Sequence, residues 1–136
     1  MAGRRKSRTL TEVELEFMHI LWREGEASPT DVMRCLEEEG RPLSDGSVRK
    51  MLSILVAKGH AQRRQAGRAF LYRATASQEK TQAILTGDLL SRAFGGSPAL
   101  LVASLLENRR INSKELARIK ELIAQHDRDA DEGKQT

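Results

Sequence analysis

The sequence predicts a mainly α-helical chain with one small β-hairpin, and three observations support this fold class. Apolar residues recur at the three- and four-residue spacing of amphipathic helices over most of the chain. Between residues 61 and 73 this spacing gives way to the alternation that is typical of strands. Aromatic residues make up only 4% of the 136 residues, which disfavours an all-β fold because strands favour aromatic side chains.

The first helix is expected to begin at Thr11, directly after a basic N-terminal arm. Residues 1–9 are polar and basic, so we expect this arm to be flexible. Thr11 can serve as the N-cap, and Glu14 three residues later completes a capping box. Gly25 marks the end of this helix.

Two further helices follow, and each has a clear start and end in the sequence. Ser28 caps the second helix, Pro29 takes its first position, and Gly40 closes it. Ser44 caps the third helix and Gly59 terminates it. The apolar residues of the third helix share one face: Val48, Met51, Leu52, Leu55 and Val56. Its free face presents mostly small and basic residues: Gly46, Ser47, Arg49, Lys50, Ser53 and Ala57.

Residues 61–65 and 69–73 predict two short strands joined by a tight turn. Gly67 supplies the positive φ that such a turn needs. Phe70 and Tyr72 are two residues apart, so both are expected to point toward the same, inward face.

The rest of the chain predicts three more helices, with Ser77 and Ser113 as caps and an almost wholly apolar segment at residues 99–107. Such a region is too apolar to stand alone on about 50 residues, because small isolated cores are marginal. We therefore expect a homodimer, although these helices could instead fold back on the N-terminal domain. The expected dimerisation residues are Leu89, Phe94, Leu101, Leu105, Leu106, Leu116, Ile119 and Ile123.

Positive charge is concentrated in one segment of the chain. The net charge of the whole chain is +4, but residues 41–75 alone carry +7, whereas residues 12–39 carry −7. A basic segment of this kind is typical of a surface that binds an anion such as nucleic acid. The alternative is an ordinary solvated surface that carries basic residues without a ligand.

The order of the predicted elements is three helices and then a hairpin, with a short link before the third helix. This order predicts a winged helix-turn-helix domain at residues 10–75. A helix fits the major groove of duplex DNA, where each base pair presents a distinct pattern of donors and acceptors. The expected DNA contacts come from the third helix and the hairpin: Ser44, Ser47, Arg49, Lys50, Ser53, Arg63, Arg64 and Arg68. A helical dimerisation domain would follow at residues 76–126, and a disordered tail at residues 127–136.

Several other classes of protein are disfavoured. No apolar run approaches the roughly 20 residues that span a bilayer, and no hydrophobic stretch follows the basic N-terminus, so neither membrane insertion nor a signal peptide is expected. The single cysteine, Cys35, fits a reducing cytoplasm and is expected to pack in the core. The three histidines lie far apart and no phosphate-binding loop is present, so we expect no metal, no cofactor and no enzyme.

Two alternatives to a DNA-binding repressor stay open on the residues alone. Winged helices also serve as protein-interaction modules, and a salt-dependent duplex-binding assay would separate the two. A ligand-gated regulator would hold a small molecule at the dimer interface, in a cavity among Leu89, Phe94 and Leu105.

The chain resembles the penicillinase repressor family (BlaI/MecI) over roughly residues 10–125. The resemblance rests on "LEFMHILW" from Leu15, "SVRKMLSILVAKGHAQRR" from Ser47, the Phe70 to Tyr72 hairpin return, and "GGSPALLVASLLE" from Gly95 followed by "LARIKELI". It implies a cytoplasmic repressor that binds a two-fold symmetric DNA operator with the third helix and the wing. It also implies dimerisation through the C-terminal helices.

The resemblance further implies a mode of regulation. Family members that respond to β-lactams are cut by a membrane-bound metalloprotease sensor at an Asn-Phe bond in the apolar C-terminal helix. Ser104-Leu105 occupies the matching place here, so any such cut is expected at that bond. Copper-responsive relatives carry a Cys-x-Cys pair, whereas this chain has only Cys35.

Overall fold

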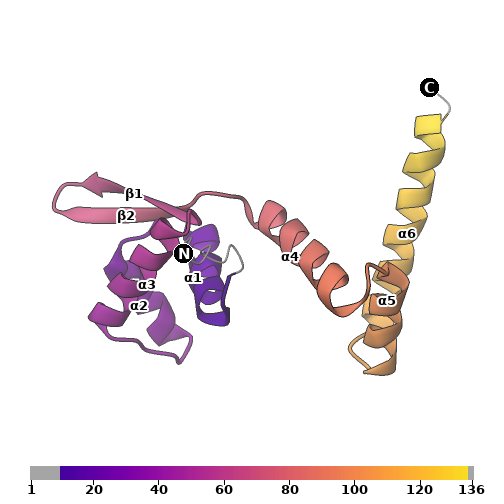
Figure 1. Cartoon of the computed structure of the whole chain (residues 1–136), viewed down its shortest axis with the longest axis horizontal. Helices are drawn as coiled ribbons and strands as arrows, with labels where there is room; N and C mark the ends of the chain where they lie inside the picture. Colours follow the sequence, from indigo (N-terminus) through magenta and orange to yellow (C-terminus); the bar gives the residue numbers. More distant parts are fainter. Residues whose placement is uncertain (1–9, 135–136) are drawn as a thin grey trace, which may run out of the picture. The chain divides into compact units, whose positions relative to one another are not determined.

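The computed structural model of the chain describes residues 10–134 and confirms a mainly helical fold with one antiparallel hairpin (Figure 1). The predicted arm at residues 1–9 lies outside the described residues. The chain divides into two compact units that meet after Thr86, within a helix. The elements are α1 Glu12–Glu24, α2 Pro29–Glu38, α3 Asp45–Ala57, β1 Ala61–Ala66, β2 Ala69–Ala74, α4 Gln78–Ala93, α5 Pro98–Glu107 and α6 Ser113–Lys134.

The helix starts of the N-terminal unit are fixed locally, as the sequence predicts. The Thr11 hydroxyl oxygen accepts from the Glu14 backbone N–H at 3.2 Å, and the Glu14 carboxylate accepts from the Thr11 backbone N–H at 3.2 Å. Ser28 and Asp31 form a second capping box of the same kind at α2. These side chains satisfy backbone donors that the first turn of a helix leaves unpaired.

One apolar core joins α1, α2, α3 and the hairpin. The predicted inner face of α3 is confirmed at Val48, Leu52 and Leu55, which are fully buried. Side chains from the other elements complete this core: Phe17, Met18, Ile20, Leu21, Ala27, Val32, Cys35, Leu36, Ala61 and Tyr72. Burial of one face of α3 leaves its opposite face free.

The hairpin pairs Ala61 with Ala74 at one end and Ala66 with Ala69 at the turn. Gly67 has φ +63° in this turn, a conformation that side chains rarely adopt. The inward orientation predicted for Phe70 and Tyr72 is confirmed only for Tyr72, which is 4% exposed.

The prediction for Phe70 is wrong, because its side chain is 38% exposed. Phe70 lies opposite Gln65, close to the turn and two positions away from Tyr72, which the core covers. The guanidinium of Arg63 lies 4.5 Å from the centre of the Phe70 ring. A cation therefore covers this ring where the core does not.

Backbone pairing attaches the hairpin to the helices. Ala27, between α1 and α2, donates to the carbonyl of Tyr72 at 2.9 Å and accepts from the Tyr72 N–H at 2.8 Å. The indole N–H of Trp22 donates to the carbonyl of Ala76 at 2.9 Å, just after β2. These contacts fix both the base of the hairpin and the point where the chain leaves it.

A buried ion pair connects the start of α1 to the end of α3. The Lys58 ammonium lies 2.8 Å from Oε1 of Glu14, and the two side chains are 17% and 2% exposed. Burial of the Glu14 carboxyl opposes ionisation, but hydrogen bonds from Lys58 and Thr11 outweigh it and lower the pKa of Glu14 below its ordinary value.

The C-terminal unit has a different character, because none of the residues in α4, α5 or α6 is buried. Ser97 caps α5, and its hydroxyl accepts from the Leu100 N–H at 3.2 Å. The cap of α6 is Asn112 rather than the predicted Ser113, since the Asn112 side-chain oxygen accepts from the Glu115 N–H at 2.8 Å.

The disordered tail predicted for residues 127–136 is wrong for residues 127–134, which continue α6 as far as Lys134. Side-chain hydrogen bonds at helical spacing support this end of the helix. The Gln125 amide donates to Asp129 at 2.9 Å, and Arg128 donates to the side-chain oxygen of Gln125. A polar composition therefore did not indicate disorder here.

We predict that Glu14→Gln destabilises the chain by about 3 kcal/mol, since it leaves the buried Lys58 ammonium without its counter-ion. The free energy of unfolding would be measured with urea at neutral pH. Because the folded pKa of Glu14 is lowered, its contribution is present above the ordinary glutamate pKa and is lost as the pH falls through the folded value. The difference between parent and variant should therefore shrink in acid.

Glu12→Gln is the matched control, because Glu12 is exposed and lies on the same helix. It should change the free energy of unfolding by no more than about 0.5 kcal/mol. Equal stabilities of the parent and the Glu14→Gln variant at neutral pH would contradict the role given to the ion pair.

Candidate nucleic-acid interface

The free face of α3 is exposed along its first two turns. Ser47, Arg49 and Lys50 are all exposed, as is Ser53 one turn later. A Cβ added at Gly46 would meet nothing within 4 Å, so the start of this face borders open space. The structure thus brings the predicted α3 contacts together on one accessible surface.

Two serines organise the N-terminus of α3. The Ser44 hydroxyl accepts from the Ser47 backbone N–H at 3.2 Å and donates to the Ser47 hydroxyl at 2.9 Å. Ser44 is therefore engaged as the helix cap. The Ser47 hydroxyl is exposed and can donate to a ligand.

Arg49 already has an acidic partner within the helix. Its Nε lies 3.0 Å from Oδ1 and 2.9 Å from Oδ2 of Asp45, and both side chains are 57% exposed. This pair was not predicted from the sequence, although the four-residue spacing is the signal that indicates it. Lys50, the next residue, has no ion pair within the described part of the chain.

The three arginines predicted as wing contacts occupy different environments. Arg63 shares the face of Tyr72 and stacks over Phe70. Arg64 lies on the other face and forms a two-pronged ion pair with Glu26, in which Nη2 and Oε2 are 3.1 Å apart. Arg68 lies in the exposed turn beside Gly67.

The hydrogen bond from Arg64 lowers the pKa of Glu26 below its ordinary value, against the opposing effect of burial. The charge of Arg73 acts in the same direction. The sequence could not indicate this pair, because its members are 38 residues apart and nothing local relates them.

The positive charge of residues 41–75 therefore separates into two groups. Some basic residues have carboxylate partners: Arg41 with Glu16, Arg49 with Asp45, Lys58 with Glu14 and Arg64 with Glu26. The others form no ion pair with a carboxylate among the described residues, although the charge of Arg73 acts on Glu26. They are Lys50, Arg63, Arg68 and Arg73. The second group is spread over α3, the turn and both faces of the hairpin, and we use the term basic face for the combined exposed surface of these two elements.

Most acidic residues of this unit lie on α1 and α2, although Asp45 lies on α3 and Glu26 contacts the hairpin. Glu37, Glu38 and Glu39 at the end of α2 are exposed, as expected for a solvated run. Glu39 accepts from Arg23 of α1 at 3.2 Å. Negative charge therefore gathers at the α1–α2 side of this unit.

The C-terminal unit exposes much of the apolar surface predicted for dimerisation. Leu89, Leu105, Leu106 and Ile123 are 36–58% exposed. The other members of the predicted set are half-buried: Phe94, Leu101, Leu116 and Ile119. No single helix within residues 10–134 is long and apolar enough to cross a membrane, and α4 and α5 reach that length and composition only as a pair with a sharp bend between them.

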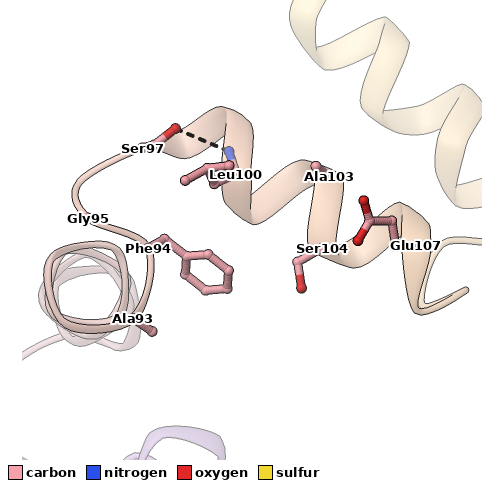
Figure 2. Close-up of a pocket in the computed structure, with 8 residues that line it drawn as sticks. All are labelled: Ala93, Phe94, Gly95, Ser97, Leu100, Ala103, Ser104 and Glu107. Atoms are coloured by element: carbon pink, nitrogen blue, oxygen red, sulfur yellow. Dashed lines mark hydrogen bonds between the residues drawn. The ribbon is translucent and has the colours of Figure 1, made fainter.

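An open cavity of about 450 Å³ lies between the end of α4 and α5 (Figure 2). Phe94 lines it, whereas Leu89 and Leu105, the other residues predicted for a ligand cavity, do not. Ser104, one of the two residues at the predicted cleavage bond, also lines it. The described residues contain no cluster of three or more His, Cys, Asp or Glu side chains that could hold a metal ion.

Comparison with known proteins identifies a family. A family model described as "Penicillinase repressor" matches residues 10–125, which is most of the chain. The penicillinase repressor of Bacillus licheniformis is 22% identical over 117 residues, covering 86% of this chain and 91% of that protein.

Two solved structures are similar to this chain over part or most of its length. The DNA-binding domain of the repressor BlaI aligns with 55% of this chain and 90% of its own length, at 24% identity and a TM-score of 0.48. A mutant MarR from E. coli, solved in complex with operator DNA, aligns with 85% of this chain and 74% of its own length, at 16% identity and a TM-score of 0.50. At this identity the MarR likeness concerns the winged-helix fold alone.

We predict that Arg64→Gln raises the pKa of Glu26 toward its ordinary value, because the hydrogen bond that favours the carboxylate is lost. The titration of the Glu26 side chain would be followed by NMR. Arg68→Gln, which removes an arginine without contact to Glu26, should leave that titration unchanged. A Glu26 midpoint that does not move in Arg64→Gln would mean that the pair does not form in solution.

Proposed function

Because this chain belongs to the penicillinase repressor family, we propose that it is a DNA-binding transcriptional repressor that binds a two-fold symmetric operator as a homodimer. The observation that carries the proposal is the basic face, where an exposed helix surface and an arginine-rich hairpin hold the cations without carboxylate partners. In this proposal the protein acts in the cytoplasm and does not itself enter the membrane.

The free face of α3 is proposed to enter the major groove. Arg49 and Lys50 can donate to guanine O6 and N7, and the small residues Gly46, Ser47 and Ser53 allow the helix backbone to approach the bases. The buried inner face of α3 supports this arrangement, since no core residue is needed for contact with DNA.

The hairpin is proposed to contact the phosphate backbone or the neighbouring minor groove. Arg68 at the exposed turn is the residue best suited to this role. Arg63 supports it from the middle of the hairpin, whereas Arg64 would first have to leave Glu26 or bind while paired. Phosphate contacts of this kind fix the orientation of the protein without reading sequence.

The exposed apolar residues of α4, α5 and α6 support a second copy of the chain as their partner. Several large apolar side chains left exposed on neighbouring helix turns are typical of an interaction site. A two-fold dimer would present two copies of α3 to half-sites separated by one or more helical turns, in steps of about 10–10.5 base pairs.

Cleavage of that region by a membrane-bound metalloprotease is the mode of relief that we propose. The bond between Ser104 and Leu105 lies within α5, where the Asn108 side chain donates to the Ser104 carbonyl at 2.8 Å. The helix must unwind before a protease can reach this bond. A cut there would divide the proposed dimerisation surface and reduce operator affinity through lost bivalency.

Two other functions are weaker alternatives. A protein-interaction module would not need the unpartnered cations of the basic face. A ligand-gated regulator has one supporting observation, the cavity beside Phe94. Its residues belong to the same apolar region that a second copy would cover.

We predict that the full chain selects a two-fold symmetric sequence from a random duplex library. In the Arg49→Ala/Lys50→Ala double variant, the affinity for that sequence should fall by about 1–3 kcal/mol for each side chain that reads a base. Arg68→Ala should instead weaken binding to all duplexes and reduce the salt slope by about 1. Circular dichroism would confirm that each variant is folded.

Two outcomes would contradict this assignment. A parent chain that binds no duplex at low salt would remove DNA as the partner. A folded double variant that binds the selected sequence with parental affinity would remove α3 as the reading element.

We predict that the parent chain sediments as a dimer at about 10–50 µM, a range in which stable and transient association differ. Leu105→Asp should sediment as a monomer, because it buries an unpaired charge in the proposed dimer surface. Lys114→Asp places the same side chain at an exposed polar position on the side of α6 opposite Leu116 and Ile123, and it should leave the dimer intact. A monomeric parent would contradict the proposal.

A further inference from the structure

Asp45 is the only acidic residue in the otherwise basic segment 41–75. It occupies the first position of α3, on the exposed surface that carries Arg49 and Lys50. A carboxylate at this place repels an anionic polymer such as DNA, so its presence weakens the general attraction of the basic face. An acidic side chain in the first turn also stabilises a helix through the helix dipole, but this stabilisation does not depend on whether the helix faces DNA.

The geometry of the pair suggests what Asp45 does. Both of its carboxylate oxygens accept from a single atom of Arg49, Nε, at 3.0 and 2.9 Å. Arg49 has five N–H donors, and the four on its two terminal nitrogens remain available. The pair favours the orientation of the Arg49 side chain in which Nε faces the carboxylate, and it leaves the two terminal nitrogens to donate together to another group.

A two-pronged donor is the group that recognises guanine in the major groove, through O6 and N7. A free arginine on a basic surface is also attracted to phosphate, which carries no sequence information. The carboxylate offsets this attraction by neutralising Arg49, and it removes rotamer freedom that Arg49 would otherwise lose on binding. Neighbouring Lys50 has no such partner within the described residues and keeps its full attraction to phosphate.

We propose that Asp45 is a positioning residue that directs Arg49 to a guanine and away from the phosphate backbone, and so determines the base specificity of α3. The proposal rests on the proposed DNA-binding function and deepens it. It makes Asp45 a residue that lowers general affinity for DNA and raises discrimination between bases.

The test is a comparison of Asp45→Asn with the parent on three duplexes: the selected sequence, the same sequence with the guanine read by Arg49 replaced, and an unrelated sequence. That guanine is identified by repeating the duplex selection with the Arg49→Ala variant. It is the position at which the variant no longer prefers guanine. In Asp45→Asn, the affinity ratio between the first two duplexes should fall by about tenfold, within the range that one bidentate contact supplies. Affinity for the unrelated duplex should rise, and the salt slope should steepen by about 1 as Arg49 engages phosphate.

Glu12→Gln is the matched control, because Glu12 is likewise an exposed acid at the first position of a helix in the same unit. Glu12→Gln removes the same charge without touching Arg49, so it should leave the affinity ratio between the first two duplexes unchanged. In an Arg49→Ala background, Asp45→Asn should leave the affinity ratio unchanged, because the side chain that Asp45 positions is absent. A fall in the ratio in that background would mean that Asp45 affects base choice without Arg49 and would overturn the proposal.

The possible outcomes distinguish failure of this inference from failure of the proposed function. An unchanged base ratio in Asp45→Asn, with the parent binding its selected sequence, overturns the role of Asp45 and leaves the proposed function standing. An equal fall in ratio for Glu12→Gln also overturns it. A parent that shows no sequence preference overturns the proposed function, and this inference falls with it.

Discussion

The ion pair between Glu14 and Lys58 fixes the orientation on which the basic face depends. Glu14 also accepts from the Thr11 N–H, so one carboxylate closes the first turn of α1 and holds Lys58, the C-cap of α3. Charges buried to this degree are tolerated only when they are paired and hydrogen-bonded. Because the pair joins the C-cap of α3 to the first turn of α1, and the core sets which face α3 buries, the free face of α3 has one position relative to the hairpin.

The basic residues of this unit therefore fall into two groups with different expected roles. Those with carboxylate partners are held in place, as Arg64 is by Glu26 and Arg49 by Asp45. In the proposed function, those without such partners in the described part of the chain, above all Lys50 and Arg68, supply the long-range attraction that brings DNA to the surface. Sequence readout needs oriented donors and encounter needs free charge, and this domain contains both.

The sequence predicted those features that depend on local contacts. Caps such as Thr11 and Ser28, and the buried face of α3, follow from spacings of three or four residues. The alternation of residues along the strand correctly placed Phe70 on the same face of the hairpin as Tyr72. It could not show that the apolar core ends before it reaches Phe70. Contacts between distant residues, such as the pair of Arg64 with Glu26, depend on tertiary structure and leave no local signal.

The most direct test of the proposed DNA contact is to map it by amide NMR chemical shifts during titration of the full chain with its selected duplex. The largest shifts are expected on residues 44–53 of α3 and residues 63–68 of the hairpin, and the acidic run at residues 37–39 should change little. Shifts confined to the α1–α2 side or to the C-terminal helices, with α3 unaffected, would contradict the central claim that the free face of α3 reads DNA.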